Sequence, residues 1–195
     1  MQRVFLDTCV WIDYLWQREG DRPAKAGNDF ASRIFSIIEE NPEIEVIFTV
    51  FLISEISDHL RDWYILKKVL ANGYSYREFG RYKKQFKLSD EEMEEINTKI
   101  LSISEAKDNV NTIATEPISV SEIEKILAFD AKLGIGFYDA LHIHTANKSK
   151  CDVFVTKDEE LRKAITKLHQ EGEIVLPCAP PKTFITQIEK VFNRG

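Results

Sequence analysis

The sequence predicts an α/β fold: a three-layer α/β/α sandwich in which helices cover both faces of a parallel sheet of four or five strands. Short apolar runs recur along the chain, and such runs are typical of strands that are buried on both faces. Stretches of helical periodicity separate these runs, an alternation that is typical of parallel strands joined by helices. The 195 residues suit a single domain, residues 1–195, that carries a helical insertion.

Strands are expected at the apolar runs. The five runs are residues 4–6, 45–50, 118–120, 153–155 and 174–176. The second is rich in β-branched and aromatic residues, which favour strands. Prolines at positions 177, 180 and 181 close the last run, because proline cannot donate a hydrogen bond to a sheet.

Helices are expected between and after these runs. They are expected over about residues 9–16, 30–40, 51–70, 121–133, 137–148, 158–170 and 183–192. Glycine and proline within residues 20–27 predict a loop before the second helix. Ser121 and Glu124 have the spacing of a capping box at the start of the fourth helix. The insertion, at about residues 72–114, has a helical composition, and we expect two helices in it that meet near Leu88.

The charge of the chain is unevenly distributed. The net charge of −6 argues against a protein that coats nucleic acid indiscriminately. Residues 61–87 nevertheless hold eight bases and two acids. The bases are Arg61, Lys67, Lys68, Arg77, Arg81, Lys83, Lys84 and Lys87, and the acids are Asp62 and Glu78. We expect this segment either to bind nucleic-acid phosphates, with its aromatic side chains stacking on unpaired bases, or to form a solvated helix face.

Cysteine usage and hydropathy indicate a cytoplasmic protein without a membrane-spanning segment. The three cysteines are odd in number and lack CxxC spacing, which indicates neither a disulfide framework nor a zinc site. The start of the chain has no signal-peptide pattern. The longest apolar run, residues 46–53, is too short to cross a bilayer.

Four acidic residues occupy sequence positions that a parallel sheet would bring close together. Asp7 directly follows the first run, and Asp158 comes shortly after the fourth. The carboxyl ends of parallel strands share one crevice. Asp139 lies near the start of its helix, and Glu55 lies in the first turns of the helix after the second run. Each acid alone is explained as a helix cap or a solvated charge.

Together, the four acids predict a metal site. Carboxylates that converge in a crevice repel one another, and a bound cation removes that cost. Oxygen ligands without a nearby cysteine favour Mg²⁺ or Mn²⁺. Such an ion supports hydrolysis of a phosphodiester, because it activates water and offsets charge on the phosphoryl oxygens.

Four segments of the chain resemble the PIN-domain ribonucleases, a family that includes the VapC-type toxins of toxin–antitoxin systems. They are VFLDT at residues 4–8, ISEI at residues 53–56, FYDALH at residues 137–142 and CDVFVTKD at residues 151–158. They occur in the family's order, and the resemblance covers most of the chain apart from roughly residues 72–114. Cys9, where a small polar residue is common, and the long helical region after Glu55 depart from the pattern.

The resemblance implies a metal-dependent endoribonuclease that acts on RNA. The implied metal ligands are Asp7, Glu55, Asp139 and Asp158, with Mg²⁺ or Mn²⁺ as the cofactor. Thr156 would orient a water or a ligand carboxylate, and Glu160 is a peripheral acid. In such an enzyme the basic candidates for RNA binding are Arg81, Lys83, Lys84 and Lys87. The implied partners are RNA, an antitoxin protein if the chain is a toxin, and a second copy of the chain in a homodimer.

Two other functions remain open from the sequence. A PIN-like module that binds RNA or protein without turnover would be expected to have lost one of the acids, and all four are present. A haloacid-dehalogenase-like phosphatase requires a second aspartate two residues after Asp7, where this chain has Cys9. His142 and His59 are interpreted as packed or hydrogen-bonded histidines, although each has the helical spacing to reach an acid of the set.

Overall fold

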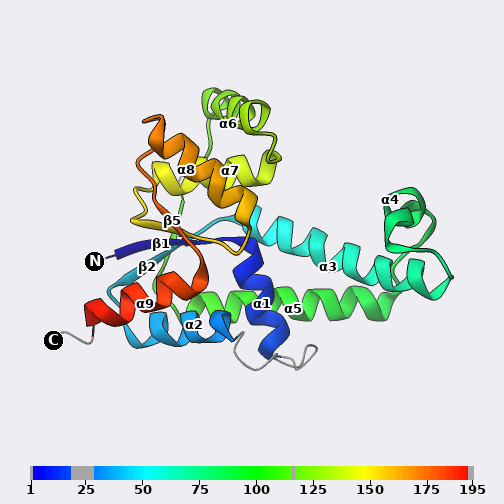
Figure 1. The fold of residues 1–195 in the computed structure, drawn as a ribbon. Helices are drawn as coiled ribbons and strands as arrows, with labels where there is room; N and C mark the ends of the chain where they lie inside the picture. The colour runs from blue at the N-terminus through cyan, green and yellow to red at the C-terminus, as the bar shows by residue number, and fades with distance from the viewer. Residues whose placement is uncertain (1, 19–28, 116, 193–195) are drawn as a thin grey trace.

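The computed structural model describes residues 2–18, 29–115 and 117–192, and these form a parallel sheet between two layers of helices (Figure 1). The strands are β1 Gln2–Leu6, β2 Ile44–Phe48, β3 Thr112–Ala114, β4 Val153–Val155 and β5 Cys178–Ala179, in the spatial order β3-β2-β1-β4-β5. All strand pairs are parallel. The predicted α/β class with a four- to five-stranded parallel sheet is confirmed.

Helices cover both faces of this sheet. They are α1 Thr8–Arg18, α2 Phe30–Glu40, α3 Val50–Ala71, α4 Phe79–Tyr82, α5 Asp90–Asp108, α6 Val120–Leu133, α7 Phe137–Lys148, α8 Glu159–Gln170 and α9 Pro181–Phe192. Figure 1 shows α6, α7 and α8 on one side of the sheet and α1, α2, α5 and α9 on the other. The loop expected over residues 20–27 lies outside the described residues. None of the described helices is both long and apolar enough to cross a membrane.

The central strand β1 fixes the position of the first acidic residue. Val4, Phe5 and Leu6 are fully buried, as an apolar run between two neighbouring strands requires. The Phe5 ring stacks on Phe154 of β4 at 5.0 Å between centroids. Since β1 lies between β2 and β4, the residue that follows it, Asp7, enters the middle of the carboxyl edge.

The prediction of a third strand at residues 118–120 is wrong. Ser119 is the N-cap of α6, where its hydroxyl accepts a hydrogen bond from Glu122 N and its own N–H donates to the Glu122 carboxylate. This capping box replaces the one expected at Ser121 and Glu124. The strand forms earlier, at β3, which pairs with β2 at the edge of the sheet.

The fifth strand expected at residues 174–176 is also displaced. Ile174 and Leu176 are buried, but the Val175 side chain is 77% exposed. The Val175 N–H donates to the side chain of Asn147 at 3.0 Å instead of to a strand. Pairing with β4 begins after this segment, where the carbonyl of Pro177 accepts from Phe154 N at 2.9 Å.

Helices α3 and α5 form an arm that extends beyond the sheet (Figure 1). They run antiparallel, because Lys68 near the end of α3 pairs with Glu92 near the start of α5. Near the sheet, Leu60 of α3 and Ile103 of α5 are buried in the main core. The 22 residues of α3 span roughly 33 Å at the rise of an α-helix. The far end of the arm holds α4 between two short 3₁₀ turns, η1 Tyr76–Glu78 and η2 Lys83–Gln85.

Candidate active site

Asp7 lies at the bottom of the crevice at the carboxyl edge of the sheet, with 5% of its surface exposed. One carboxylate oxygen accepts a hydrogen bond from Thr8 N at 2.9 Å. The other accepts from Thr156 Oγ1 at 2.6 Å and from the Cys9 thiol at 3.0 Å. Burial raises the pKa of Asp7 although these donors favour its ionised form. Cys9 therefore contributes a hydrogen bond to this carboxylate.

Thr156 connects Asp7 to the next acid of the set. Its hydroxyl donates to Asp7 and accepts from Asp158 N at 3.0 Å. Asp158 is the N-cap of α8, where one carboxylate oxygen accepts from Leu161 N at 2.9 Å. Both acids expected at the ends of neighbouring strands thus lie at the same edge, with a buried threonine between them.

Asp139 reaches the crevice from the first turn of α7. Gly134 ends α6 in the left-handed conformation with φ of 65°, and Gly136 caps α7 with φ of 97°, so the two glycines allow a tight turn that other residues would strain. Burial, and then the negative charges of Asp7, Glu55 and Asp158, raise the pKa of Asp139 to about 7. No residue in the described ranges donates a hydrogen bond to this carboxylate or forms an ion pair with it.

Glu55 on α3 has a different environment. Its Oε2 is hydrogen-bonded to His142 Nε2 at 2.7 Å and to the Thr8 hydroxyl, and His59 Nε2 lies 3.7 Å from Oε1. Burial alone would raise the pKa of Glu55, but the hydrogen bonds from His142 and His59 lower it well below its usual range. The His142 ring is fully buried, in contact with Phe5. Its Nδ1 finds no partner in the part of the chain that the structure describes.

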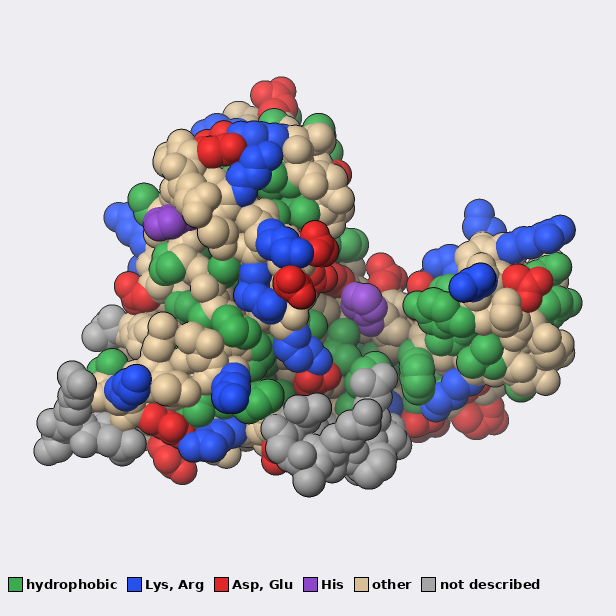
Figure 2. Space-filling view, viewed as in Figure 1, with side chains coloured by type: hydrophobic (Ala, Val, Ile, Leu, Met, Phe, Trp, Pro, Cys, Tyr) green, Lys and Arg blue, Asp and Glu red, His purple; other side chains and the backbone are tan. Residues whose placement is uncertain are grey.

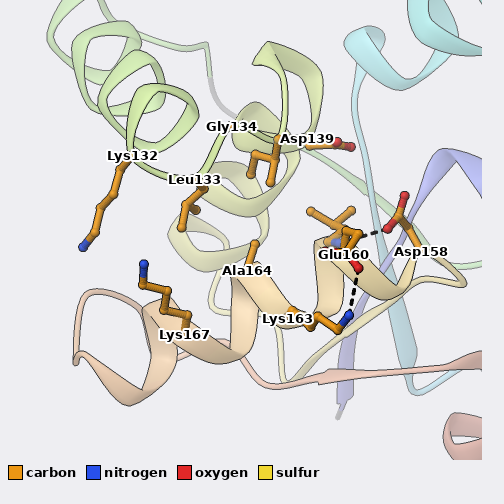
Figure 3. A pocket seen from close by; sticks show the side chains of 11 residues that line it. Lys132, Leu133, Gly134, Asp139, Asp158, Glu160, Lys163, Ala164 and Lys167 are labelled. Atoms are coloured by element: carbon orange, nitrogen blue, oxygen red, sulfur yellow. Dashed lines mark hydrogen bonds and ion pairs between the residues drawn. The ribbon is translucent and has the colours of Figure 1, made fainter.

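A pocket of about 450 Å³ opens beside Asp139 and Asp158. The two acids lie at one end, and the amino groups of Lys132 and Lys167 lie at the other (Figure 3). Lys132 pairs with two glutamates of the loop after α8. The Lys167 amino group has no ion-pair partner among residues 2–18, 29–115 and 117–192. The pocket therefore combines carboxylates with a cationic end.

The residues predicted from the sequence separate into two places. The four acids lie close together, because the charges of Asp7, Glu55 and Asp158 raise the pKa of Asp139. Thr156 lies among them, hydrogen-bonded to Asp7. Glu160 lies on the pocket rim, paired with Lys163 at 2.8 Å. The four basic candidates, Arg81, Lys83, Lys84 and Lys87, lie at the far end of the arm.

The structure adds three features to the site that the sequence predicts. Thr8 contacts Asp7 and Glu55 at once. His142 was interpreted as a packed or hydrogen-bonded histidine; it is both, and its partner is Glu55. The pocket lysines Lys163 and Lys167 were not predicted from the sequence, although they stand four residues apart and therefore share one face of the helix that Asp158 caps.

The donor set fits a divalent metal by its chemistry. It consists of carboxylate oxygens, and hard cations favour such ligands. Among these carboxylates, that of Asp139 has no ion-pair partner in the described residues. The side chains are not closed around an ion: within the described residues, no three His, Cys, Asp or Glu side chains form a group that could hold one as they stand. Glu55 in particular is turned to the histidines.

Comparison with known proteins identifies one family. The family model described as PIN domain matches residues 4–166. No curated protein matches the chain. One similar solved structure is described as "Structure of FitAB bound to IR36 DNA fragment"; its matching chain is 13% identical, the match covers 91% of this chain and 94% of that chain, and the TM-score is 0.48.

The raised pKa of Asp139 predicts a pH-dependent loss of stability in the metal-free protein. Between about pH 4 and the folded pKa of about 7, the native state keeps a proton that the unfolded chain has lost, so the free energy of unfolding falls as pH rises. Asp139→Asn removes this cost. At about pH 8 it should melt a few degrees above wild type, equivalent to about 1 kcal/mol after solvent screening.

Thermal melts in chelator measure this difference. The two melting temperatures should converge as the pH falls to about 3, where the carboxyl group is mostly protonated in both states. Asp108→Asn, at an exposed position on α5, is the matched control and should follow wild type throughout. A difference in melting temperature between Asp139→Asn and wild type that does not change with pH would contradict the raised pKa of Asp139.

Proposed function

The chain belongs to the PIN-domain family, whose model spans residues 4–166, and from this premise we propose that it is a metal-dependent endoribonuclease that hydrolyses RNA phosphodiester bonds. PIN domains are generally nucleases. The observation that carries the proposal is the convergence of four carboxylates, of which Asp139 has no ion-pair partner and no hydrogen-bond donor among the described residues. Such an arrangement is costly to stability and is typical of a site that binds a cation.

We propose Asp7, Glu55, Asp139 and Asp158 as the residues that hold Mg²⁺ or Mn²⁺. A bound divalent ion would supply the positive charge that stabilises the phosphoryl oxygens during hydrolysis. Thr156 holds the Asp7 carboxylate in one orientation through its 2.6 Å hydrogen bond, and this is the positioning role that we assign to it. His142 and Thr8 do the same for Glu55.

The remaining residues of the pocket suit an RNA strand. Asp139 is free of hydrogen bonds to the described residues, so its oxygens are available to an ion or to the proton of an attacking water. Lys167 lies at the opposite end of the same pocket, where it can pair with a phosphate next to the bond that is cut, whereas Lys132 is already paired with two glutamates. The choice of RNA over DNA rests on the family resemblance of the four acidic segments.

A second candidate function is a PIN-like module that binds RNA or protein without cleaving it. The observation that favours it is the lack, among the described residues, of a closed group of metal ligands, together with the engagement of Glu55 by His142 and His59. Under this proposal the acids would remain a crowded, metal-free cluster. Cleavage and metal binding separate the two functions.

A toxin role, with an antitoxin protein and a second copy of the chain as partners, is the finer part of the proposal. It rests on the resemblance to VapC-type toxins. A 610 Å³ groove beside the site offers an apolar surface to a protein partner. Its lining includes Val50, Phe51, Ile123 and Phe137, whose side chains are exposed. A neighbouring reading frame for a small antitoxin-like protein would support this role.

Substitution of the acids should abolish cleavage without unfolding the protein. Asp139→Asn and Asp7→Asn should each lower kcat/KM on single-stranded RNA by more than about a hundred-fold, and Thr156→Val by roughly ten- to a hundred-fold, as found for residues that only orient ligands. Asp108→Asn, at an exposed position on α5, should cleave as wild type does. Near-wild-type rates for both aspartate variants, with native circular dichroism, would rule out the proposed site.

Removal of metal should stop the reaction. Chelation should abolish cleavage and Mg²⁺ or Mn²⁺ should restore it. The ion should also raise the melting temperature, because an ion at a hundred times its Kd stabilises the native state by about 2.7 kcal/mol, and Asp139→Asn should reduce this shift. Cleavage that survives exhaustive chelation would exclude the metal-dependent mechanism. A wild-type protein that neither binds added metal nor cleaves RNA would favour the binding module.

A further inference from the structure

The far end of the arm carries a cluster of exposed cations. We call residues 72–89, which join α3 to α5, the arm tip. Its cations Arg77, Arg81, Lys84 and Lys87 are exposed, and their charged groups have no ion-pair partner in the described part of the chain. Figure 2 shows Lys and Arg side chains gathered over the upper part of the tip. In a protein of net charge −6, such a cluster is a local attraction for anions.

Three of the acidic side chains near the arm tip are engaged within the protein, whereas Asp90, Glu91 and Glu94 at the start of α5 are exposed. Glu78 closes a capping box with Ser75 at the start of η1, and Glu92 pairs with Lys68. Asp62 pairs with Lys83 at 3.1 Å. Lys83, one of the four basic candidates, therefore helps to hold the tip on α3, while the other three remain available to a ligand.

The arm tip lies on the same face of α3 as the acidic site. Glu55, His59 and Asp62 occur at i, i+4 and i+7, and these positions share one face of a helix. The contact of Glu55 with His59 and the pairing of Asp62 with Lys83 are consistent with this alignment. From Glu55, Asp62 lies about 10 Å along the helix and Ala71, its last residue, lies about 24 Å along it. Figure 2 shows that the surface is hollowed between the body of the molecule and the tip.

The aromatic residues of the tip divide into two groups. Tyr74 stacks on Tyr82 at 4.0 Å and meets Phe86 edge-on at 6.5 Å, so these three rings pack the tip itself. Tyr76, next to Arg77, is 72% exposed. An exposed ring among cations is the combination with which proteins bind single-stranded nucleic acid, since the ring stacks on a base and the cations pair with the backbone.

We propose that the arm tip binds the phosphates of a single-stranded RNA several nucleotides away from the bond that is cut, and thereby sets a minimum length for efficient substrates. This inference rests on the proposed ribonuclease function. A site crowded with carboxylates repels RNA, so the attraction must come from another surface. A span of about 10 to 24 Å corresponds to roughly three to seven nucleotides at the 3.4 Å rise of a stacked duplex strand, and to fewer where the strand is extended.

Charge reversal tests the binding directly. Arg81→Glu/Lys84→Glu changes two exposed cations of the tip, and Lys182→Glu/Lys190→Glu makes the same change of charge on α9. Fluorescence anisotropy would measure affinity for a single-stranded RNA of about 20 nucleotides, in chelator, between about 50 and 200 mM salt. The tip variant should bind at least about ten-fold more weakly at low salt, and its log–log salt slope should be smaller by about 1.4, or 0.7 for each lost contact.

Cleavage of RNAs of two lengths completes the test. On the long RNA, the tip variant should raise KM and leave kcat near wild type. On a dinucleotide, whose single phosphodiester is the bond that is cut and which therefore places no phosphate on the tip, the two proteins should have equal kcat/KM. Tip and control variants with the same affinity and salt slope would overturn the proposal, and the cations would then suit an acidic protein partner. A wild type that cleaves no RNA defeats the proposed function instead, and the titration still decides whether the tip binds RNA.

Discussion

The mutual repulsion of carboxylates at the carboxyl edge of the sheet is the constraint on which the rest of the site depends. Asp7 follows strand β1, whose last three residues are fully buried, and its position is fixed by the sheet. Once Asp7 is buried, each further acid that approaches it has a higher cost of ionisation. The surrounding residues distribute that cost unequally. Thr156, Cys9 and Thr8 N donate to Asp7, whereas no described residue donates to Asp139.

Because of this unequal distribution, the pKa values of Glu55 and Asp139 are shifted in opposite directions, although the sequence alone does not distinguish the two carboxylates. Glu55 is held ionised by two histidines and a threonine, and Asp139 retains its proton up to about neutral pH. The buried imidazole of His142 is thus part of the electrostatics of the site. A cation that enters the crevice would relieve the repulsion at Asp139 most, because that carboxylate has the least compensation. The energetic cost that the fold carries at this edge is the physical reason to propose a metal-dependent function for it.

The sequence predicts the architecture where the signal is a buried apolar run, as at β1, β2 and β4. It fails where a local hydrogen bond competes, as at Ser119, whose capping box with Glu122 begins a helix, and at Val175, whose N–H is taken by Asn147. Strand β3 is short and lies at the sheet edge, so its pattern is weak. The four acids could be predicted from their positions after strands and near helix starts. The bond between Glu55 and His142 could not, because 87 residues separate them and no local spacing indicates the contact.

The central claim is that burial, and then the charges of its acidic neighbours, raise the pKa of Asp139 and leave its carboxyl group available to a divalent ion. Carbon-13 NMR of the side-chain carboxyl, with Asp139→Asn to assign the resonance, measures this pKa directly during a pH titration. The account predicts a midpoint of about 7 in the metal-free protein, which should fall when Mg²⁺ is added, since an adjacent cation favours the ionised form. A midpoint near 4, the value of an unperturbed aspartate, that does not respond to Mg²⁺ would contradict it.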